Sequence, residues 1–333
     1  MTRHFLDVDD LSCEELEEVL ALAAGAPSPV LGGRGVALVF EKPSARTRSS
    51  AELAVVGLGG HPVYIQGAEV GIDVRETAED VARTLACFHD VLCARVLDHT
   101  TLLRMAEAID RDSARTWPGP DDGTGVRAVP VVNLLSDRAH PCQAVADLLT
   151  MRQVLGDLGG RTVAYIGDAN NVWRSLAKAA AMVGMSLRTA CPEAFAPDAE
   201  DLALLTALGA DVEVTHDPVE AASGADAIYT DVWTSMGQED EAELRRFAFA
   251  AFTVDQRLLD AAAPGAVVLH CLPAHRGEEI SAEVVDGPHS VVWRQAANRM
   301  HAMRGILAWL VAVERGGDAV ETQGVPTPVE GRP

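Results

Sequence analysis

Residues 35–50 read GVALVFEKPSARTRSS and pass from an apolar run into a polar, arginine-rich one. The apolar run predicts a buried strand, and a helical pattern of apolar positions begins after Pro43. We expect Ser44 to cap this helix. The unpaired backbone N–H groups at the helix start, with the guanidinium groups of Arg46 and Arg48, would form an anion site suited to a phosphate. The alternative is a surface helix whose arginines are simply solvated, and the segment alone leaves both open.

The composition is that of a folded, acidic protein. The chain has 333 residues, of which 48% are hydrophobic, and this is long enough for two domains. A net charge of −22 argues against a nucleic-acid or anionic-membrane partner. The six cysteines include no C-x-x-C pair, and the N-terminus lacks the apolar core of a signal peptide. We therefore predict reduced thiols and a soluble, cytoplasmic protein.

Strand patterns alternate with helical patterns along most of the chain. This alternation predicts an α/β fold with two doubly wound domains, each with a parallel sheet, joined by interdomain helices. The expected strands are 35–40, 61–66, 91–96, 129–135, 162–166, 186–190, 226–231 and one that begins at 266. A Gly-, Pro- and Asp-rich loop is expected at 112–128, a final helix at 296–315 and a disordered tail at 316–333.

Polar residues follow two strands of the first half. Arg95 lies at the end of strand 91–96, and ligands of open α/β sheets bind outside the carboxyl ends of strands. Arg95 could therefore face the anion site, although a surface ion pair is the commoner role of such an arginine. His140 and Gln143 lie at the start of the next helix, where they could supply a hydrogen bond or proton and an amide. A helix cap with a solvent-exposed histidine is the alternative.

The second half places similar groups at strand ends. Asn170 and Asn171 lie in a turn without the G-x-G-x-x-G spacing, so two amides that bind a carboxylate or amide are favoured over a dinucleotide site. Asp231 could pair with the ammonium of an amino acid, or it could simply form a turn.

Cys271 lies where the last strand enters a loop. It could be a reactive or substrate-positioning thiol, a metal ligand with His270 and His275, or an inert cysteine. Neighbouring strand residues point to opposite faces, which argues against the metal site.

Four motifs, taken together and in this order, resemble those of the aspartate/ornithine carbamoyltransferase family. They are Ser44-Ala45-Arg46-Thr47-Arg48, His140-Pro141-Cys142-Gln143, Asp231-Val232-Trp233-Thr234-Ser235-Met236-Gly237 and His270-Cys271-Leu272-Pro273. The last two resemble the ornithine branch. The resemblance implies transfer of the carbamoyl group of carbamoyl phosphate to the side-chain amine of L-ornithine. The products would be L-citrulline and phosphate, in arginine biosynthesis or, in reverse, catabolism, with no metal and no cofactor.

The resemblance also implies domains and site residues. Residues 1–139, completed by the helix 296–315, would bind carbamoyl phosphate, and residues 140–295 would bind ornithine. The implied carbamoyl-phosphate residues are Ser44, Ala45, Arg46, Thr47, Arg95, His140, Gln143, Cys271, Leu272 and Arg299. The implied ornithine residues are Asn171, Asp231, Ser235 and Met236. Arg95, His140 and Cys271 would be catalytic, and the family implies a homotrimer or a multiple of trimers.

Three positions depart from the family pattern. Ala45 stands in place of the threonine of S-T-R-T-R, and Ala297 in place of the glutamate of A-E-N-R. Gly71 stands where many relatives have a glutamine that reaches a neighbouring subunit, and Arg75 is a candidate to replace that contact. Two alternatives therefore stay open. One is a carbamoyltransferase for another amine, such as N-acetylornithine or putrescine, and the other is a non-catalytic homologue that binds carbamoyl phosphate.

Overall fold

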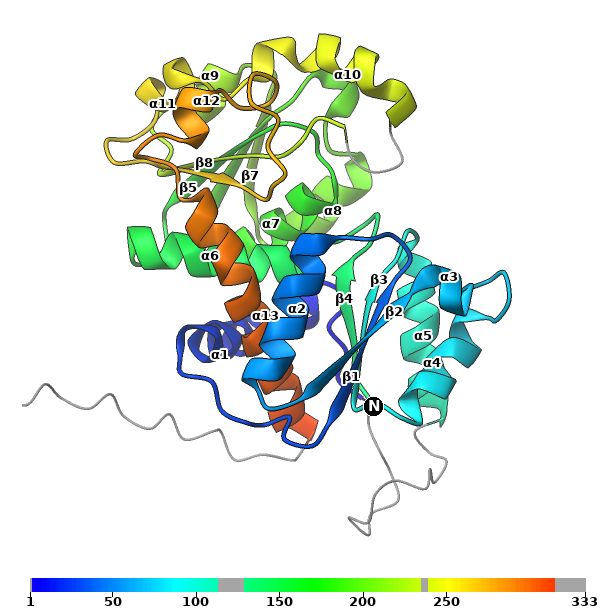
Figure 1. The fold of residues 1–333 in the computed structure, drawn as a ribbon. Helices are drawn as coiled ribbons and strands as arrows, with labels where there is room; N and C mark the ends of the chain where they lie inside the picture. Colours follow the sequence, from blue (N-terminus) through cyan, green and yellow to red (C-terminus); the bar gives the residue numbers. More distant parts are fainter. Residues whose placement is uncertain (1, 113–128, 235–238, 315–333) are drawn as a thin grey trace, which may run out of the picture.

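Two parallel sheets occupy separate halves of the molecule in the computed structural model, which describes residues 2–112, 129–234 and 239–314 (Figure 1). The first sheet has the order β2-β1-β3-β4, with β1 Gly35–Phe40, β2 His61–Gln66, β3 Val91–Arg95 and β4 Val131–Leu135. The second has the order β7-β6-β5-β8-β9, with β5 Thr162–Ile166, β6 Ser186–Ala190, β7 Asp211–Thr215, β8 Ala227–Thr230 and β9 Val267–His270. The predicted fold class is confirmed.

In each sheet the chain reverses its direction of travel across the sheet at one point. The switch lies between β1 and β3 in the first sheet and between β5 and β8 in the second. Such switch points leave a crevice at the carboxyl ends of the strands, where ligands of this fold class bind. The loops that follow these four strands are therefore the places to look for a site.

Helices cover both faces of both sheets. In the first half these are α1 Cys13–Ala24, α2 Ala45–Gly57, α3 Gly67–Val70, α4 Ala78–Ala86 and α5 His99–Asp112. The others are α6 Pro141–Leu155, α7 Asn171–Met182, α8 Ala199–Ala207, α9 Pro218–Ala222, α10 Ala242–Phe249, α11 Gln256–Ala261, α12 Ala282–Val285 and α13 Val292–Glu314. Short 3₁₀ turns lie at Val8–Asp10, Glu193–Phe195, Glu239–Glu241 and Ala250–Phe252.

The alternation of side chains along β1 builds two cores. Val36, Leu38 and Phe40 belong to the core that includes α1, α2, α6 and α13, whereas Ala37 and Val39 belong to the core beneath α4 and α5. The first of these cores continues into the second half through Val163 and Tyr165 of β5. The two halves therefore share one hydrophobic core.

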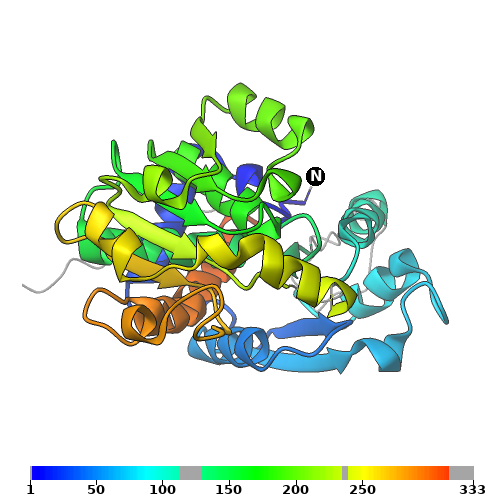
Figure 2. The ribbon, with the colours of Figure 1, turned by 90° about the horizontal axis from the view of Figure 1, so that it is seen from above.

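Two helices join the halves. α6 follows β4 and leads to β5, and α13 runs from the second half back to the first, where it packs on α1 and α2 as well as on α6 (Figures 1 and 2). α13 crosses α1 closely, because a Cβ on Gly305 would lie 2.5 Å from the carbonyl oxygen of Val19. These contacts support the prediction that the last helix completes the first domain. The boundary between residues 139 and 140 stays a prediction.

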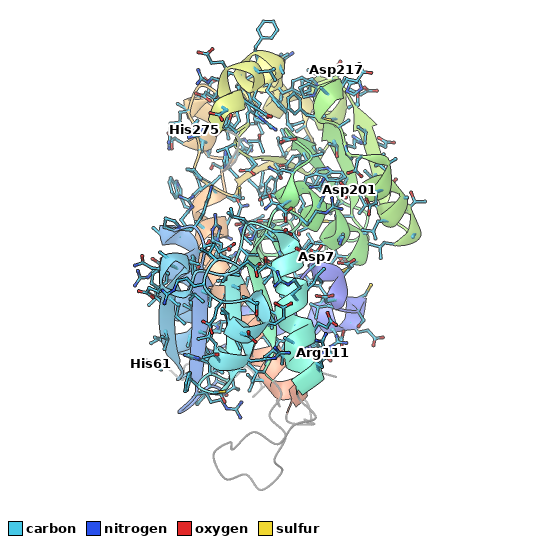
Figure 3. All side chains as sticks on the ribbon, turned by 90° about the vertical axis from the view of Figure 1, so that its right-hand side faces the viewer. Asp7, His61, Arg111, Asp201, Asp217 and His275 are labelled. Atoms are coloured by element: carbon cyan, nitrogen blue, oxygen red, sulfur yellow. The ribbon has the colours of Figure 1, made fainter. Side chains whose placement is uncertain are left out.

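The N-terminal segment makes a third connection, at Asp7, which lies between the two halves (Figure 3). The Asp7 carboxylate accepts hydrogen bonds from Ser175 Oγ at 3.0 Å and from Lys178 Nζ at 2.7 Å, both on α7. Burial raises the pKa of Asp7, and the charge of Lys178 opposes that rise.

β7 was not among the strands predicted from the sequence, because its residues, DVEVT, form no apolar run. The other differences lie at the ends of elements. β4 begins at Val131 rather than at Val129, and α13 begins at Val292 rather than at Ala296. Val292 and Trp293 have low helix propensity, and this concealed the first turn of α13. The predicted loop at 112–128, apart from Asp112 at the end of α5, and the predicted tail at 316–333 lie outside the described residues. No helix in the described part of the chain combines the length and the apolar character that a membrane span needs.

Candidate active site

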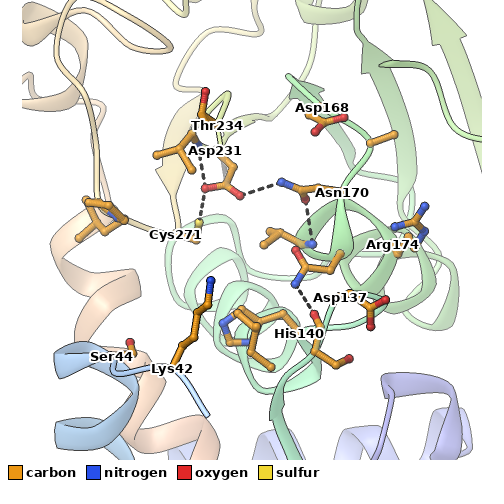
Figure 4. A pocket seen from close by; sticks show the side chains of 18 of the residues that line it. Lys42, Ser44, Asp137, His140, Asp168, Asn170, Arg174, Asp231, Thr234 and Cys271 are labelled. Carbon is orange, nitrogen blue, oxygen red and sulfur yellow. Dashed lines mark hydrogen bonds between the residues drawn. The ribbon is translucent and has the colours of Figure 1, made fainter. Parts of the chain in front are cut away.

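A cavity of about 760 Å³ lies between the two halves, at the carboxyl ends of both sheets (Figure 4). Its wall includes residues from the loops that follow β1, β3, β5 and β8, the four strands that flank the switch points, and from the loop after β9. Of the predicted site residues it brings together Ser44, Arg46, Thr47, Arg95, His140, Asn171, Asp231, Cys271, Leu272 and Arg299. Ser235 and Met236 lie outside the described residues.

One end of the cavity is the start of helix α2. Ser44 caps this helix as predicted, since its side-chain oxygen accepts a hydrogen bond from the backbone N–H of Thr47 at 3.4 Å. Ser44 Oγ also donates to Thr47 Oγ1 at 3.1 Å. From α13, Arg299 donates through Nη2 to Thr47 Oγ1 at 2.8 Å, and through Nη1 to Gln143 Oε1 at 2.7 Å. Hydroxyls, a helix start and a guanidinium therefore meet at one place.

Three arginines concentrate positive charge at this end. Arg95 and Arg299 are buried, whereas Arg46 is exposed at the cavity mouth. Burial, together with the nearby charges of Arg299 and Arg46, lowers the pKa of Arg95 to about 10. Within the described residues, no Asp or Glu forms an ion pair with Arg46 or Arg299. An anion bound between them would relieve this repulsion, which is the electrostatic signature of a phosphate site.

His140 stands beside the arginines as a neutral side chain. Burial lowers the pKa of His140 well below its ordinary value, and the charges of Arg299 and Arg95 add to the effect. Its Nδ1 atom is buried without a hydrogen-bond partner among the described residues. His140 lines the cavity and is buried, so the predicted alternative of a solvent-exposed histidine is wrong.

Two of the predicted carbamoyl-phosphate residues do not line the cavity. Gln143 is buried behind Arg299, with its carbonyl oxygen on that guanidinium. The Ala45 side chain is exposed and contributes no polar group. Any contact from residue 45 would therefore come from its backbone N–H at the start of α2.

The other end of the cavity is organised around Asp231. Cys271 Sγ donates to Asp231 Oδ1 at 2.8 Å, and Asn170 Nδ2 donates to Asp231 Oδ2 at 3.0 Å (Figure 4). Asn170 is held in turn as the cap of α7, because its Oδ1 accepts from the backbone N–H groups of Val172 and Trp173. Asp231 therefore has a fixed direction and is more than a turn former.

The Cys271 thiol is protonated at neutral pH. Burial raises the pKa of Cys271 well above its ordinary value, and the adjacent carboxylate of Asp231 raises it further. A thiol that donates to a carboxylate keeps its lone pairs for a ligand but is neither a nucleophile nor a base. The geometry favours the substrate-positioning role among the three that the sequence left open.

The turn after β9 departs from regular backbone. Leu272 has a positive φ of 61°, and its backbone N–H donates to His270 Nδ1 at 2.9 Å. His270 Nε2 lies 3.0 Å from Glu279 Oε1, and both side chains are fully buried. Since Nδ1 accepts a hydrogen bond, Nε2 carries the proton and donates to Glu279. The turn that carries Cys271 is thus held by the hydrogen bonds of His270 to Leu272 and Glu279.

The expectation that His270 and Cys271 point to opposite faces is wrong. Ligand atoms of Asp231, His270 and Cys271 lie within 4.8 Å of one another, because β9 ends at His270 and the strand alternation stops there. Both ring nitrogens of His270 are nevertheless engaged in hydrogen bonds, so His270 has none left for a metal.

Asn171 and Arg75 are held by nearby backbone. Asn171 lines the cavity, but its Nδ2 donates to the carbonyl oxygen of Ser136 at 2.6 Å, across from the end of β4. Arg75 Nη1 donates to the carbonyl oxygen of Glu69 at 3.0 Å. Gly71 ends α3 with φ of 63°, a conformation that favours glycine and accounts for the residue found there.

The cavity also contains residues that the sequence prediction missed. Lys42 extends into it from the side of Ser44 (Figure 4), and Asp168 lines it where Arg245 Nη1 donates to Asp168 Oδ2 at 2.7 Å. The signal for Lys42 was available, because lysine occurs only at 42 and 178 in this chain. Asp168 follows β5, and its position at a switch point would have identified it had the strand order been known.

Models of one protein family match nearly all of this chain. Residues 3–153 match the aspartate/ornithine carbamoyltransferase carbamoyl-P binding domain, and residues 159–310 match the Asp/Orn binding domain. The chain belongs to the aspartate/ornithine carbamoyltransferase family. The resemblance found in the four motifs is thereby confirmed.

Relatives within this carbamoyltransferase family match over their full length. The ornithine carbamoyltransferase of Acidothermus cellulolyticus is 45% identical, over 98% of this chain and 100% of that protein. The solved structure of ornithine carbamoyltransferase from Pyrococcus furiosus is 40% identical with a TM-score of 0.82, over 92% of this chain and 96% of that one. The corresponding enzyme structure from Thermus thermophilus is 42% identical with a TM-score of 0.80, over 93% and 99%.

Proposed function

We propose that this chain is an ornithine carbamoyltransferase, which transfers the carbamoyl group of carbamoyl phosphate to the side-chain amine of L-ornithine. One observation carries the proposal. The cavity has an arginine cluster at one end and the Cys271–Asp231 pair at the other. A dianionic donor and an amine acceptor would therefore meet between them. The names of the full-length relatives support the same activity.

The phosphate would lie at the start of α2. Ser44, Arg46 and Thr47 would bind its oxygens with the backbone N–H groups there, and Arg299 would close the site from α13. As the C–O bond breaks, negative charge grows on the departing phosphate. Donors that are already in place stabilise that charge without reorganisation.

The carbonyl oxygen would face Arg95 and His140. Attack on the carbonyl carbon creates a tetrahedral intermediate with negative charge on this oxygen. A charged guanidinium and a neutral imidazole can both donate to it, and removing one such donor commonly costs a factor of about 10² to 10³ in rate. Gln143 would act through Arg299, since its oxygen already binds that guanidinium.

The amine of ornithine would lie beside Cys271 and Leu272, with Asp231 and Asn171 toward its amino-acid end. The amine attacks in its neutral form, and formation of the C–N bond gives the tetrahedral intermediate. The C–O bond to phosphate breaks when this intermediate collapses, and the proton that the amine loses ends on the phosphate or in water. Because Cys271 is a protonated thiol, it would orient the amine and would not take up that proton. The family resemblance assigns Ser235 and Met236 to the same subsite, and both lie outside the described residues.

The remaining parts of the proposal concern assembly and context. We place the protein in the cytoplasm, in arginine metabolism, as a homotrimer or a multiple of trimers. Residues 1–139 with the last helix would form the carbamoyl-phosphate domain, and residues 140–295 the ornithine domain. Sedimentation of the purified protein would test the assembly.

The activity is tested with a panel of acceptors. The protein is incubated with carbamoyl phosphate and, separately, ornithine, N-acetylornithine, putrescine and aspartate, and the ureido product is measured. Rapid product with ornithine alone is expected. Product with another amine would keep the phosphate site and overturn the amino-acid assignment. No product, while carbamoyl phosphate still raises the melting temperature, would indicate a binding protein.

A further inference from the structure

A continuous set of buried hydrogen bonds runs between α6 and α13 and joins the two ends of the cavity. Gln143 and Asp147 lie one helical turn apart on α6, and Gln295 and Arg299 lie one turn apart on α13. All four side chains are buried, and Asp147 exposes no surface at all. Two faces of packed helices thus meet through polar groups alone at this place.

The bonds form an unbroken sequence. Arg299 Nη1 donates to Gln143 Oε1 at 2.7 Å, and Gln143 Nε2 donates to Asp147 Oδ1 at 2.8 Å. Gln295 Nε2 donates to the same Asp147 Oδ1 at 2.7 Å. Gln295 Oε1 accepts from the backbone N–H of His270 at 2.8 Å. One carboxylate oxygen is therefore the meeting point of both helices.

Chemistry fixes the direction of every bond in this sequence. A guanidinium and a backbone N–H can only donate, so the amides of Gln143 and Gln295 must turn their oxygens toward Arg299 and His270. Their NH₂ groups then face Asp147, whose Oδ1 must accept twice. A flipped amide at either position would break two bonds at once, and each buried group left unpaired would be costly.

The two ends of the sequence are parts of the site. Arg299 reaches Thr47 in the phosphate cradle, and His270 precedes Cys271 and accepts from the backbone N–H of Leu272. Neither Asp147 nor Gln295 is among the residues that line the cavity. Their contribution to the reaction can therefore come only through the residues they hold.

Burying the carboxyl group of Asp147 at this position costs free energy. Burial raises the pKa of Asp147 to about 7, against the opposing effect of the hydrogen bonds from Gln143 and Gln295. An apolar side chain would pack between two helices without that cost. The Oδ1 atom of Asp147, however, joins α6 to α13 through Gln143 and Gln295.

We propose that Asp147 and Gln295 are positioning residues: they hold Arg299 and the turn that carries Cys271 in a fixed relation, so that the response of the amino-acid subsite to an occupied phosphate cradle depends on these two side chains. The inference rests on the proposed function, because it assumes carbamoyl phosphate at one end and an amino acid at the other. An anion that draws Arg299 toward the cradle pulls on Gln143, and the shared oxygen of Asp147 passes the displacement to Gln295 and the backbone of the Cys271 turn.

The coupling is measured with L-norvaline, which has the carbon chain of ornithine without the reacting amine and so binds without turnover. Its dissociation constant is determined by calorimetry with and without saturating carbamoyl phosphate, and the ratio is the coupling factor. For the unsubstituted protein we expect a factor within the range of about 5 to 150 that is typical of linked sites.

The variants separate coupling from stability. Gln295→Met keeps the side-chain length but removes both hydrogen bonds, and Asp147→Leu removes the shared acceptor, so both should bring the factor toward 1. Asp147→Asn keeps an acceptor oxygen and should retain the factor. Thr150→Val is the matched control, because Thr150 Oγ1 accepts from Asn298 Nδ2 at 2.9 Å one turn further along the same two helices. It should lower stability and leave the factor unchanged.

An unchanged factor in folded Gln295→Met would overturn the inference, as would an equal loss in Thr150→Val. Gln295→Met and Asp147→Asn settle the question even where Asp147→Leu does not fold. If the unsubstituted protein binds both ligands with a factor of 1, the inference fails and the proposed function stands. If it binds neither ligand, the proposed function fails and the inference with it.

Discussion

The two ends of the cavity would bind different chemical groups, and their residues are distributed differently along the chain. The phosphate end takes Ser44, Arg46 and Thr47 from one short segment and adds Arg95 and Arg299. The amine end collects single residues from loops far apart in the chain, such as the pair of Asn170 and Asp231, which are 61 positions apart. The phosphate end binds an anion through charge, and one of its arginines, Arg46, can therefore be exposed. A neutral amine has no charge to bind, so the other end needs directed hydrogen bonds from buried side chains.

The largest effect is expected at the phosphate end of the cavity. Arg95→Met should lower kcat/KM for carbamoyl phosphate by a factor of about 10² to 10³, because a donor to the developing oxyanion is lost. Norvaline affinity without carbamoyl phosphate should not change. Steady-state kinetics and calorimetry measure the two.

The matched control for this variant is Arg152→Met, which removes a guanidinium paired with Glu17 on the outside of the molecule at 2.6 Å. Equal losses of activity in both arginine variants would show that the effect of Arg95→Met is structural.

A substitution at the amine end should affect the kinetics for ornithine more than those for carbamoyl phosphate. Cys271→Ser keeps a donor to Asp231 but shortens its reach, so the KM for ornithine should rise about tenfold, the equivalent of about 1.4 kcal/mol. The KM for carbamoyl phosphate should change little. Cys142→Ser, at a buried thiol that does not line the cavity, is the control. Unchanged ornithine kinetics in Cys271→Ser would show that the thiol has no role in binding the amine.

Low pH should decrease the stability of the protein through His140, at the phosphate end of the cavity. His140 is buried with a pKa well below its ordinary value, whereas in the unfolded chain it takes up a proton near pH 6.5. The free energy of unfolding should therefore decrease as the pH falls below about 6.5, because the unfolded state binds the extra proton. Urea unfolding of the wild type and of His140→Gln between pH 5 and 8 measures this. Parallel pH profiles for the two proteins would contradict the burial of a neutral His140.

A second pH effect is expected from the carboxyl between the helices. The pKa of Asp147 rises from 3.8 to about 7 on folding, so its contribution to stability is lost as the pH rises through that interval. Asp147→Asn has no such proton and should gain stability relative to the wild type between pH 4.5 and pH 7.5. The same unfolding series reports this difference, and a constant difference across that range would show that the carboxyl does not titrate there.

The fold could be predicted because its signals are local. Most strands are short apolar runs bounded by turn residues, and their alternation with helices indicated parallel sheets. β7, with the sequence DVEVT, is an exception. The phosphate cradle was predictable for the same reason, since Ser44 to Thr47 are consecutive. The hold of Asn170 on Asp231 depends on which strands become neighbours, and the sequence does not state the strand order.

Gln295 was missed for a related reason. The first turn of α13 contains Val292 and Trp293, so the helix was predicted to start after Gln295. A residue assigned to a loop has no helix face, and its partnership with Asp147 could not be inferred. Helix starts rich in β-branched or aromatic residues are places where positioning residues escape sequence analysis.

The return of α13 to the first half has a consequence for synthesis on the ribosome. The faces of α1 and α2 that it covers are translated early, but their cover is among the last segments of the chain to emerge. Until α13 is made, the first sheet can form, but the apolar surfaces of α1 and α2 that α13 covers stay exposed. The nascent chain must therefore protect that surface, alone or with a chaperone, for most of the time it takes to be made.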